Sequence, residues 1–548
     1  MREQTGWLQR VARNDLLAFG FFVGLSLVLR TQVFSASVVD MDESLYFLIA
    51  KDLRAGFMPY ETIFEHKPVG TFIIFGLFQT LLGDRVIAIR IATILAVAIS
   101  ALLIKAITDL LVSATLEEDS ARSESTASSG PIARWAPGLV AGSLFAVYST
   151  TNGGLAANTE HFFIPFVCGA FLLIMKLVVD PSVARGGARG AWYLVGAGLL
   201  MGLALQVKYL VAWEAILLGL VILSLGYFHG APASGRTVSK RSLAAVFLYA
   251  IGVIAPSALV VAVFWSRGMW DAWLYANITA NIAYGRLAGF AAGAWMDAIA
   301  AQAASQSVLW AAALLTLAFV TRGPGSRPIK AAGLLLFLWW IAGLAGASST
   351  RLFFEHYFLQ PLAPACIMSA WLVLVILPRT LKWPAGGGSL RLARWGLVTL
   401  VFAQAIGLTG EALLKSAKAI DGRVRGGDAW PNGEPTRVAA SIRDEIRSGD
   451  EIYVVDYELI VYHLAGARWP TRYIFPTQLP MPRGYTLDVH PLDELERIIA
   501  RDPLFIVKQR RSSGSPEFFA ALQAAIERDY VMHDSIGQVN IYRRRADR

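Results

Sequence analysis

Acidic and basic side chains gather in one short stretch of an otherwise apolar chain. Asp40, Asp42 and Glu43 stand together, and the Glu-His-Lys triplet at 65–67 follows after an aromatic-rich turn. A fixed carboxylate can take the proton of an attacking hydroxyl, a contribution typically worth ~10²–10⁴-fold in rate. A fixed ammonium can stabilise the negative charge of a departing group. The simpler alternative is a solvated loop with incidental charges.

The composition around this stretch is that of a membrane protein. Of the 548 residues, 55% are hydrophobic and only 16% are charged, and the mean hydropathy is +0.51; soluble domains carry about 25% charged residues. The net charge of +9 is typical of basic cytoplasmic loops, not of nucleic-acid binding. Cys168 and Cys366 fall in apolar runs, so we expect free thiols and no disulfide framework.

The apolar runs predict about eleven spanning helices, since a span needs ~20 apolar residues. These are 15–36, 86–112, 135–150, 161–179, 191–207, 209–228, 244–265, 304–321, 331–347, 357–378 and 395–413. No small-residue cleavage site follows the first run, which predicts a signal-anchor helix that is retained. The run 68–82 is short, so we expect it to lie at the interface or to re-enter.

Lysine and arginine set the expected orientation. With the N-terminus inside, the cytoplasmic segments are the most basic ones; they are 1–14, 113–134, 180–190, 229–243, 322–330 and 379–394. Counting 68–82 as a span would reverse every later loop and destroy this bias. The polar segment 117–133 predicts a flexible cytoplasmic loop. The stretch 37–85 and the C-terminal part then lie outside.

The last part of the chain changes character. Charges become frequent, and "DEIYVVDYELIVYHL" predicts a strand followed by a helix or a second strand. "PLDELERIIA" predicts an amphipathic helix, and "PLFIVKQ" and "QVNIYRRR" predict strands. We therefore expect an α-helical polytopic membrane domain over 1–414 and a small α/β extracytoplasmic domain over 415–548.

The charged stretch resembles the first outer loop of a known family. "DMDESLYFLIAKDLRAGFMPY" followed by "HKPVG" is similar to the loop of GT-C glycosyltransferases in the protein O-mannosyltransferase, ArnT-like and RgtA-like branch. The matching features are the pair Asp42-Glu43, the aromatic Tyr46, the Gly-x-x-Pro-Tyr turn that ends at Tyr60, and Lys67 before a proline. One departure concerns an acid: some relatives have Glu directly before the lysine, where this chain has His66.

Weaker similarities continue downstream. Glu160 follows "NGGLAANT" where the family often has an acid, and "GLALQVKYL" resembles a family helix that places Lys208. "RLFFEHYFLQPLAP" resembles the segment that opens a late helix and contributes Arg351 and His356. "YHLAGARWPTRYIFP" is similar to the outer domain of RgtA-like members.

The resemblance implies a GT-C fold and transfer of a sugar from a polyprenyl-phosphate donor by a single inverting displacement. It implies Asp42 as general base and Lys67 as the cation that meets the lipid phosphate. Glu43 and Asp40 are expected to orient either the base or the acceptor. Crowded carboxylates also raise one another's pKa, which suits a base. Lys208 is a second candidate cation, although such a lysine can also snorkel at a helix end.

Further substrate contacts are expected from Tyr46, Tyr60, His66 and Glu160. Arg351 and His356 are expected to contact phosphate or acceptor, or else to anchor the chain at the interface. The aromatics of 270–284 line a sugar or lipid groove, or form an interfacial belt.

The need for a metal and the roles of two charged residues, Asp52 and Arg54, stay open at this level. His66 beside Glu65 is at most half a metal site, so a divalent cation is possible but not required. Asp52 and Arg54 are expected to be solvated or to stabilise the fold.

The implied acceptor is lipid A, lipopolysaccharide core, another envelope glycan or a protein hydroxyl, and the sugar is a hexose or a pentose. The expected place is the bacterial inner membrane, with the site on the periplasmic side. A transporter or flippase of lipid-linked sugars is the first alternative, although the chain lacks the internal repeats typical of transporters. A non-catalytic scaffold that binds glycan is the second.

Overall fold

The computed structural model describes most of the chain. The described residues are 2–122, 131–180, 182, 187–228, 240–287, 289, 291–323, 325–380, 388–424, 433–481 and 488–546. They form two compact units, Met1–Arg30 with Thr93–Val260 and Phe290–Lys415, and Thr31–Ala92 with Val261–Gly289 and Ser416–Arg548. We describe each unit by itself.

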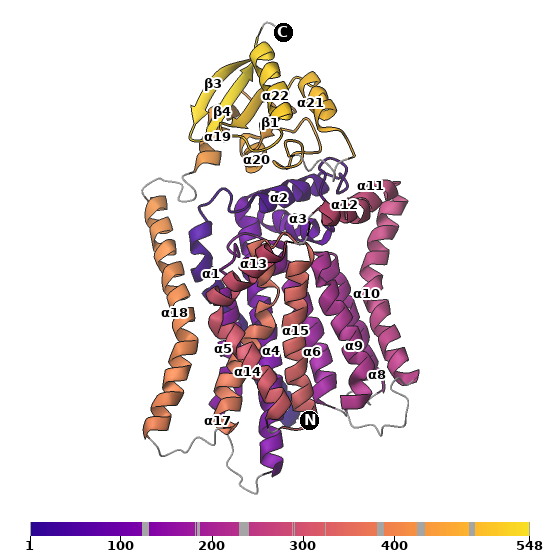
Figure 1. Cartoon of the computed structure of the whole chain (residues 1–548), viewed down its shortest axis with the longest axis vertical. Coiled ribbons are helices and arrows are strands. Elements are labelled where there is room, and N and C mark those ends of the chain that lie inside the picture. Colours follow the sequence, from indigo (N-terminus) through magenta and orange to yellow (C-terminus); the bar gives the residue numbers. More distant parts are fainter. Residues whose placement is uncertain are drawn as a thin grey trace. The chain divides into compact units, whose positions relative to one another are not determined.

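The first unit is helical (Figure 1). Its helices are α1 (Arg2–Arg30), α5 (Pro131–Tyr148), α6 (Thr159–Val179), α8 (Gly187–Leu205), η2 (Tyr209–Val211), α9 (Ala212–Phe228), α13 (Ala292–Ser305), α14 (Ser307–Arg322), α15 (Arg327–Ser349), η4 (Glu355–Leu359), α16 (Leu362–Trp371), η5 (Leu372–Ile376) and α17 (Leu377–Thr380), together with most of α4 (Val86–Arg122), α10 (Lys240–Ser266) and α18 (Gly388–Val424). Helix α6 packs on α8, and α16 packs on α5 and α15. The stacked rings of Phe171 and Trp339, with centroids 3.9 Å apart, lie in this core.

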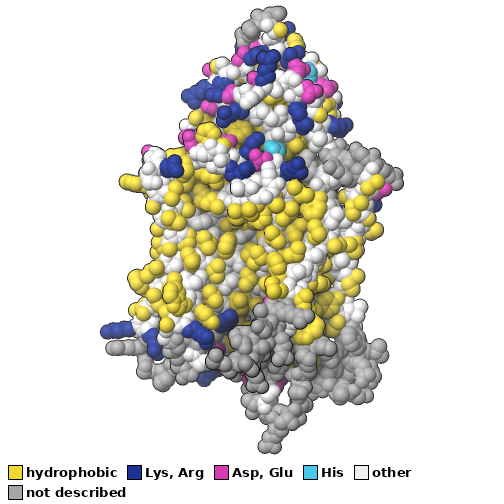
Figure 2. Space-filling view, turned by 180° about the vertical axis from the view of Figure 1, so that it is seen from behind, with side chains coloured by type: hydrophobic (Ala, Val, Ile, Leu, Met, Phe, Trp, Pro, Cys, Tyr) yellow, Lys and Arg dark blue, Asp and Glu magenta, His cyan; other side chains and the backbone are white. Residues whose placement is uncertain are grey.

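The membrane-spanning character is confirmed. Within the described ranges, eight helices are long and apolar enough to cross a bilayer, and nine if the bent pair α13–α14 counts as one span. The predicted spans 135–150 and 209–228 correspond to shorter apolar helices. Most side chains of α10 and α18 face outward, since only 17% and 12% of their apolar windows are buried. Figure 2 shows hydrophobic side chains covering the helical part on this face, as expected for lipid contact.

Three predicted boundaries were wrong. Residues 117–122 belong to α4 instead of a loop, because the Glu, Ala and Arg among them are strong helix formers. The centre of that loop, 123–130, lies outside the described residues, as do 229–239 and 381–387 within the predicted basic segments 229–243 and 379–394. The span predicted from 304 begins at Ser307, because Gln306 leaves the helical region and turns the chain by 95°. The helix predicted as the span 395–413 is longer, since α18 continues to Val424.

The second unit contains a small α/β domain. Its sheet has the order β1 (Ile452–Val455), β2 (Phe505–Gln509), β4 (Val539–Arg544) and β3 (Tyr530–Ile536). Strand β1 is parallel to β2 and the other pairs are antiparallel. Helices α19 (Glu434–Arg443), α20 (Ile460–Ala465), α21 (Pro491–Ala500) and α22 (Pro516–Asp529) complete it. The strands and helix predicted from the four quoted segments are therefore confirmed.

The rest of this unit consists of outer-loop and helical segments. These are η1 (Thr31–Val33), α2 (Met41–Arg54), α3 (Gly70–Leu82), α11 (Trp270–Leu274), the π-helical turn η3 (Tyr275–Thr279) and α12 (Ala280–Leu287). Helix α2 begins because Asp40 caps it, accepting a hydrogen bond from the amide of Asp42. One face of α2 packs on α3 and α20. The 13-residue α3 is too short to span a bilayer, in keeping with the predicted interfacial position.

Candidate functional site

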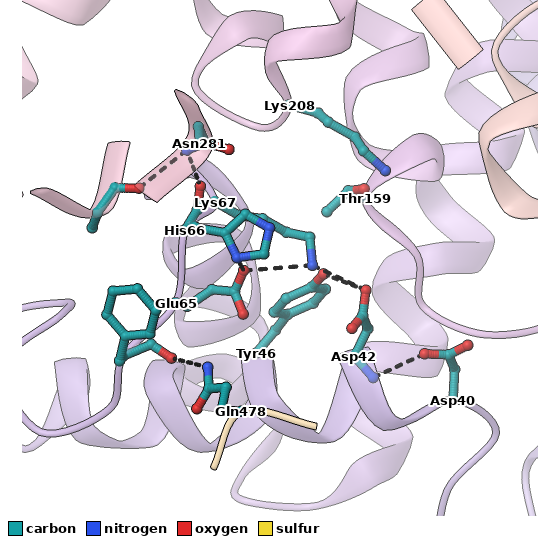
Figure 3. Close-up of polar contacts among 12 residues, drawn as sticks. Asp40, Asp42, Tyr46, Glu65, His66, Lys67, Thr159, Lys208, Asn281 and Gln478 are labelled. Carbon is teal, nitrogen blue, oxygen red and sulfur yellow. Dashed lines mark hydrogen bonds and ion pairs between the residues drawn. The ribbon is translucent and has the colours of Figure 1, made fainter. Parts of the chain in front are cut away.

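The first turn of α2 holds the expected base. Oδ2 of Asp42 lies 3.0 Å from Nζ of Lys67 and accepts a hydrogen bond of 2.8 Å from the phenol of Tyr46 (Figure 3). Tyr46 is one helical turn further along α2, so the two side chains lie on the same face. Burial and the nearby Asp42 raise the pKa of the Tyr46 phenol, which stays protonated and therefore donates.

Lys67 bridges two carboxylates. Its ammonium also lies 3.5 Å from Oε1 of the buried Glu65, and 4.9 Å from the ring centre of Tyr46. Nδ1 of His66 is 3.3 Å from the same Glu65 oxygen. The structure thus gathers Asp42, Tyr46 and the triplet 65–67, as the sequence predicted. We call these five residues the carboxylate–lysine cluster.

Glu43 points away from this cluster and into the protein. Both of its oxygens accept hydrogen bonds from the guanidinium of Arg90 on α4, and Oε1 also accepts one of 2.7 Å from the amide of Val39. Only 1–2% of either charged side chain is exposed. The pair fixes the start of α2, so Glu43 holds the backbone that carries Asp42.

Asp40 is the N-cap residue of the same helix, α2. Its pKa is raised to about 6 by burial and by the charge of Asp42. Burial, together with Asp40 and Glu43, also raises the pKa of Glu458 to about 7. The effect of Asp42 on Asp40 agrees with the expectation for crowded carboxylates.

The turn between α2 and α3 is held in an unusual conformation. Tyr60, which is buried, has φ of 71°, a left-handed value that is strained for a residue with a Cβ. Its phenol donates hydrogen bonds to the carbonyl of Lys67, at 2.7 Å, and to Oδ1 of Asn277, at 3.3 Å. Tyr60 therefore positions the backbone of the lysine.

Two asparagines that the sequence reading missed complete this support. Nδ2 of Asn281 donates to the carbonyl of His66 at 2.8 Å, and Asn277 meets Tyr60. They stand four residues apart across η3 and α12, a spacing that places both on one helical face. That spacing, in "ANITANI", was the available signal. π-Helical turns such as η3 are frequent at functional sites.

The C-terminal domain also forms hydrogen bonds with residues 62–64 of the outer loop. The amide of Phe64 donates to the carbonyl of Arg472 at 2.8 Å. Nε1 of Trp469 donates to the carbonyl of Thr62 at 3.1 Å. Nε2 of Gln478 donates to the carbonyl of Phe64 at 3.3 Å. These residues were expected only as part of an outer domain.

One acidic and one basic side chain of α2, Asp52 and Arg54, make contacts that stabilise the fold. Asp52 is buried and accepts a hydrogen bond of 2.5 Å from Thr62. Arg54 pairs with Asp84 and donates to Thr80 at 3.1 Å. Their contacts agree with the fold-stabilising alternative.

Four predicted residues lie in the other compact unit. Lys208, in the break between α8 and η2, forms a buried ion pair with Glu160 in the first turn of α6. Its Nζ lies 3.9 Å from the ring centre of Tyr357. The ammonium is therefore paired inside the protein and does not snorkel. His356 precedes Tyr357 on η4 and stacks on Phe354.

Arg351 lies in a strained segment of the same unit. Its φ is 61°, and that of Phe353 is 51°, so two residues with side chains adopt left-handed conformations within three positions. Such strain is typical of ligand-binding segments. The side chain of Arg351 is exposed.

A metal centre finds no support in these side chains. Across the described ranges, no group of three or more His, Cys, Asp or Glu side chains is arranged to hold a metal ion. Cys168 and Cys366 are free and buried.

The fold matches solved structures over nearly its whole length. ArnT from Cupriavidus metallidurans bound to undecaprenyl phosphate matches with a TM-score of 0.57 and 14% identity, covering 99% of this chain and 98% of that one. The apo state of that protein matches with a TM-score of 0.55. AglB, the oligosaccharyltransferase of Archaeoglobus fulgidus, in complex with an inhibitory peptide and a dolichol-phosphate, matches with a TM-score of 0.50 and 14% identity, covering 97% of this chain and 74% of that chain.

Sequence comparison gives no such match. No family model matches the chain, and no curated protein matches it. ArnT and AglB are both GT-C enzymes. The chain therefore has the GT-C fold that its outer loop predicted.

Proposed function

We propose that this chain with a GT-C fold is a membrane glycosyltransferase that takes a sugar from a polyprenyl-phosphate donor. The acceptor is a hydroxyl of an envelope lipid or glycan, such as lipid A or lipopolysaccharide core, or of a protein. The observation that carries the proposal is the pairing of Asp42 with Lys67, 3.0 Å apart at the first turn of α2. A carboxylate held beside a cation supports a base next to a group that can meet phosphate.

The proposed reaction is a single displacement. The acceptor oxygen forms a bond to the anomeric carbon while the bond from that carbon to the phosphate oxygen breaks. The hydroxyl proton passes to Asp42, and the bonding electron pair leaves on the polyprenyl phosphate. Lys67 stabilises the charge that develops on this phosphate, and Tyr46 holds the carboxylate through its hydrogen bond. The configuration at the anomeric carbon is inverted.

The ligand-free arrangement suggests how Lys67 serves both partners. Its ammonium lies between the carboxylates of Asp42 and Glu65, and a lysine side chain has three donors on a flexible stem. An arriving phosphate draws the ammonium towards itself, which frees Asp42 to accept a proton. Glu65 then keeps the lysine charged and oriented. This order couples donor binding to activation of the base.

Support for the donor class comes from the fold. One similar protein is bound to undecaprenyl phosphate and another to a dolichol-phosphate. We place the chain in the bacterial inner membrane, with the site and the domain 415–548 on the periplasmic side, and the membrane domain over 1–414. Glu160, Lys208, Arg351 and His356 are proposed as further substrate contacts. A divalent cation is not needed for the step as written.

The test compares envelope lipids in a deletion strain complemented with wild type, Asp42→Asn or Glu61→Gln. Glu61 is the matched control, because it lies in the same loop, is exposed and accepts a hydrogen bond from the nearby amide of Met58. We expect mass spectrometry to show one glycan lacking a sugar and the polyprenyl-phosphate sugar accumulating with Asp42→Asn, at protein levels equal to wild type. Restoration by Asp42→Asn as complete as by Glu61→Gln would refute the base. Accumulation of donor on the cytoplasmic face alone would favour a flippase.

A further inference from the structure

A pocket lies beside the carboxylate–lysine cluster in the same compact unit. It has a volume of about 340 Å³ and is lined by Tyr60, Phe64, Asp271, Ala272, Tyr275, Arg472 and Asp488. Three separate segments thus build its wall. Its size is near the lower end of the ~300–1,000 Å³ range of small-ligand sites, which suits a single ring or two.

Aromatic rings form one side of the pocket. The ring centres of Phe64 and Tyr275 are 5.8 Å apart, and Phe64 is also 5.6 Å from Tyr473. Phe64 is buried, whereas Tyr275 is only partly buried and so offers its ring to a ligand. An aromatic face packs well against the C–H face of a pyranose ring, an apolar surface edged by hydroxyls.

Charged groups also line the pocket, and their balance selects the ligand. Nη2 of Arg472 lies 2.6 Å from Oδ2 and 2.8 Å from Oδ1 of Asp488, so this cation is already neutralised. Asp271 adds a second, exposed carboxylate. An anionic ligand would meet a net negative charge here. Hydroxyl groups, by contrast, can donate to the carboxylates and accept from the guanidinium.

Tyr60 connects this pocket to the carboxylate–lysine cluster. Its ring lines the pocket, while its phenol donates to the carbonyl of Lys67 at 2.7 Å. Its left-handed backbone shows that the surroundings hold it there against its own preference. A ligand in the pocket would therefore contact the residue that positions the proposed phosphate-binding lysine.

We propose that this pocket binds a neutral pyranose ring of the acceptor, stacked on Tyr275 and hydrogen-bonded to Asp271 and Asp488. That the ring belongs to the acceptor rests on the proposed function. The binding of a neutral sugar rests on the pocket alone. A sugar site gives the aromatic segment 270–284 a role in ligand binding. In an interfacial belt, the same side chains would only need to face lipid.

Binding is tested on the full chain in lipid nanodiscs free of sugar detergents. Saturation-transfer NMR is recorded with methyl α-D-glucopyranoside, methyl α-D-mannopyranoside and methyl β-D-galactopyranoside, and with glucose 6-phosphate as the anionic probe. We expect at least one neutral glycoside to be saturated and the phosphate to bind more weakly. Stronger binding of the phosphate, or no saturation of any glycoside, would overturn the proposal.

Variants assign the signal to the pocket. Tyr275→Ala is expected to weaken glycoside binding about tenfold or more, as loss of a central aromatic contact does, and the exposed Asp271→Asn several-fold. Trp270→Ala is the matched control, since this aromatic lies on the same helical segment and does not line the pocket. If Tyr275→Ala fails to fold, Asp271→Asn decides. Unchanged binding in the folded variants would refute the site.

Kinetics separate the acceptor from the donor. Tyr275→Ala should raise the KM for acceptor about tenfold and leave the KM for donor unchanged. A rise in the donor KM instead would overturn the assignment to the acceptor. Asp42→Asn should retain glycoside binding while losing transfer. Full transfer by Asp42→Asn would refute Asp42 as the base, and absence of transfer by the wild type would end the proposed function; neither outcome touches the sugar site.

Discussion

Nζ of Lys67 lies 3.0 Å from Oδ2 of Asp42, although the two residues belong to different segments of the outer loop. The lysine also approaches Glu65 at 3.5 Å. Its charge is therefore shared between a proposed base and a second carboxylate. Lys67→Gln should lower kcat/KM by about 10²–10³-fold, the usual cost of removing a group that stabilises transition-state charge.

A charge-conserving variant shows whether the charge of Lys67 or the shape of its side chain matters for activity. Lys67→Arg keeps the cation but replaces a compact ammonium by a planar fork. We expect it to recover part of the activity and most of the donor affinity in assays with purified protein. Equal losses in both variants would mean that geometry alone matters. Full activity of Lys67→Gln would contradict the assigned role.

Tyr46→Phe tests the support of the base. The ring contacts with Phe72 and Phe75 remain, at centroid distances of 5.9 and 6.0 Å, so the fold should hold. The lost hydrogen bond to a carboxylate should lower kcat by about tenfold and leave the apparent Tm within about a degree or two. A large fall in Tm would show that the phenol is structural. Tyr462→Phe, whose phenol meets the amide of Val454 in the C-terminal domain, is the control for kcat.

The Glu43–Arg90 pair predicts a large stability effect. Removing one partner of a buried ion pair typically costs about 3–5 kcal/mol, so Arg90→Ala should sharply lower the apparent Tm and the folded yield. Arg54→Ala is the matched control, because its pair with Asp84 is partly exposed and such pairs contribute about 0–1 kcal/mol. Similar melting curves for the two variants would contradict this account.

The two raised carboxyl pKa values predict the pH dependence of stability. Asp40 titrates at about 6 and Glu458 at about 7 in the folded chain, above the ordinary values of 3.8 and 4.5. The folded state therefore holds more protons, and the stability that these two groups contribute is fully present below about pH 4 and is lost as pH rises to about 6 and then 7. The apparent Tm should fall between about pH 4 and pH 7 on account of these groups and level off above. Asp40→Asn keeps the helix cap and, like Glu458→Gln, should flatten this slope.

The Glu160–Lys208 pair predicts a partial rescue. Lys208→Met leaves a buried carboxylate without its cation, so the folded yield should fall. The double variant Lys208→Met with Glu160→Gln removes both charges and should restore the yield. If it also restores full transfer, the pair is purely structural. If transfer stays low, Lys208 contacts a substrate, as we propose.

The residues of the candidate site could be predicted because they lie near one another in the sequence. Asp42 and Tyr46 share a helical turn, and the triplet 65–67 follows in the same loop, so a local pattern sufficed. The partners that fix them could not be found this way. Arg90 looks like a loop-end cation at the start of a span, and only tertiary packing turns it to Glu43. Trp469 bonds to Thr62 across 407 residues of chain.

Helix boundaries failed for a similar reason. The apolar run around 304 does not show that Gln306 breaks the helix and turns the chain by 95°. The short run 68–82 forms a helix of 13 residues, in keeping with the prediction that it does not span a bilayer. Hydropathy thus locates apolar segments well, whereas their bends and continuations depend on neighbours.

Trp469, Arg472 and Gln478 hold the backbone of residues 62–64 from the far end of the chain. The C-terminal domain and the first outer loop therefore depend on each other's sequences. A chimaera that takes its C-terminal domain from another transferase would lose these hydrogen bonds to the native loop. We expect exchanges of this domain to give active protein only when the first outer loop is exchanged with it, although the spanning helices separate the two segments in the sequence.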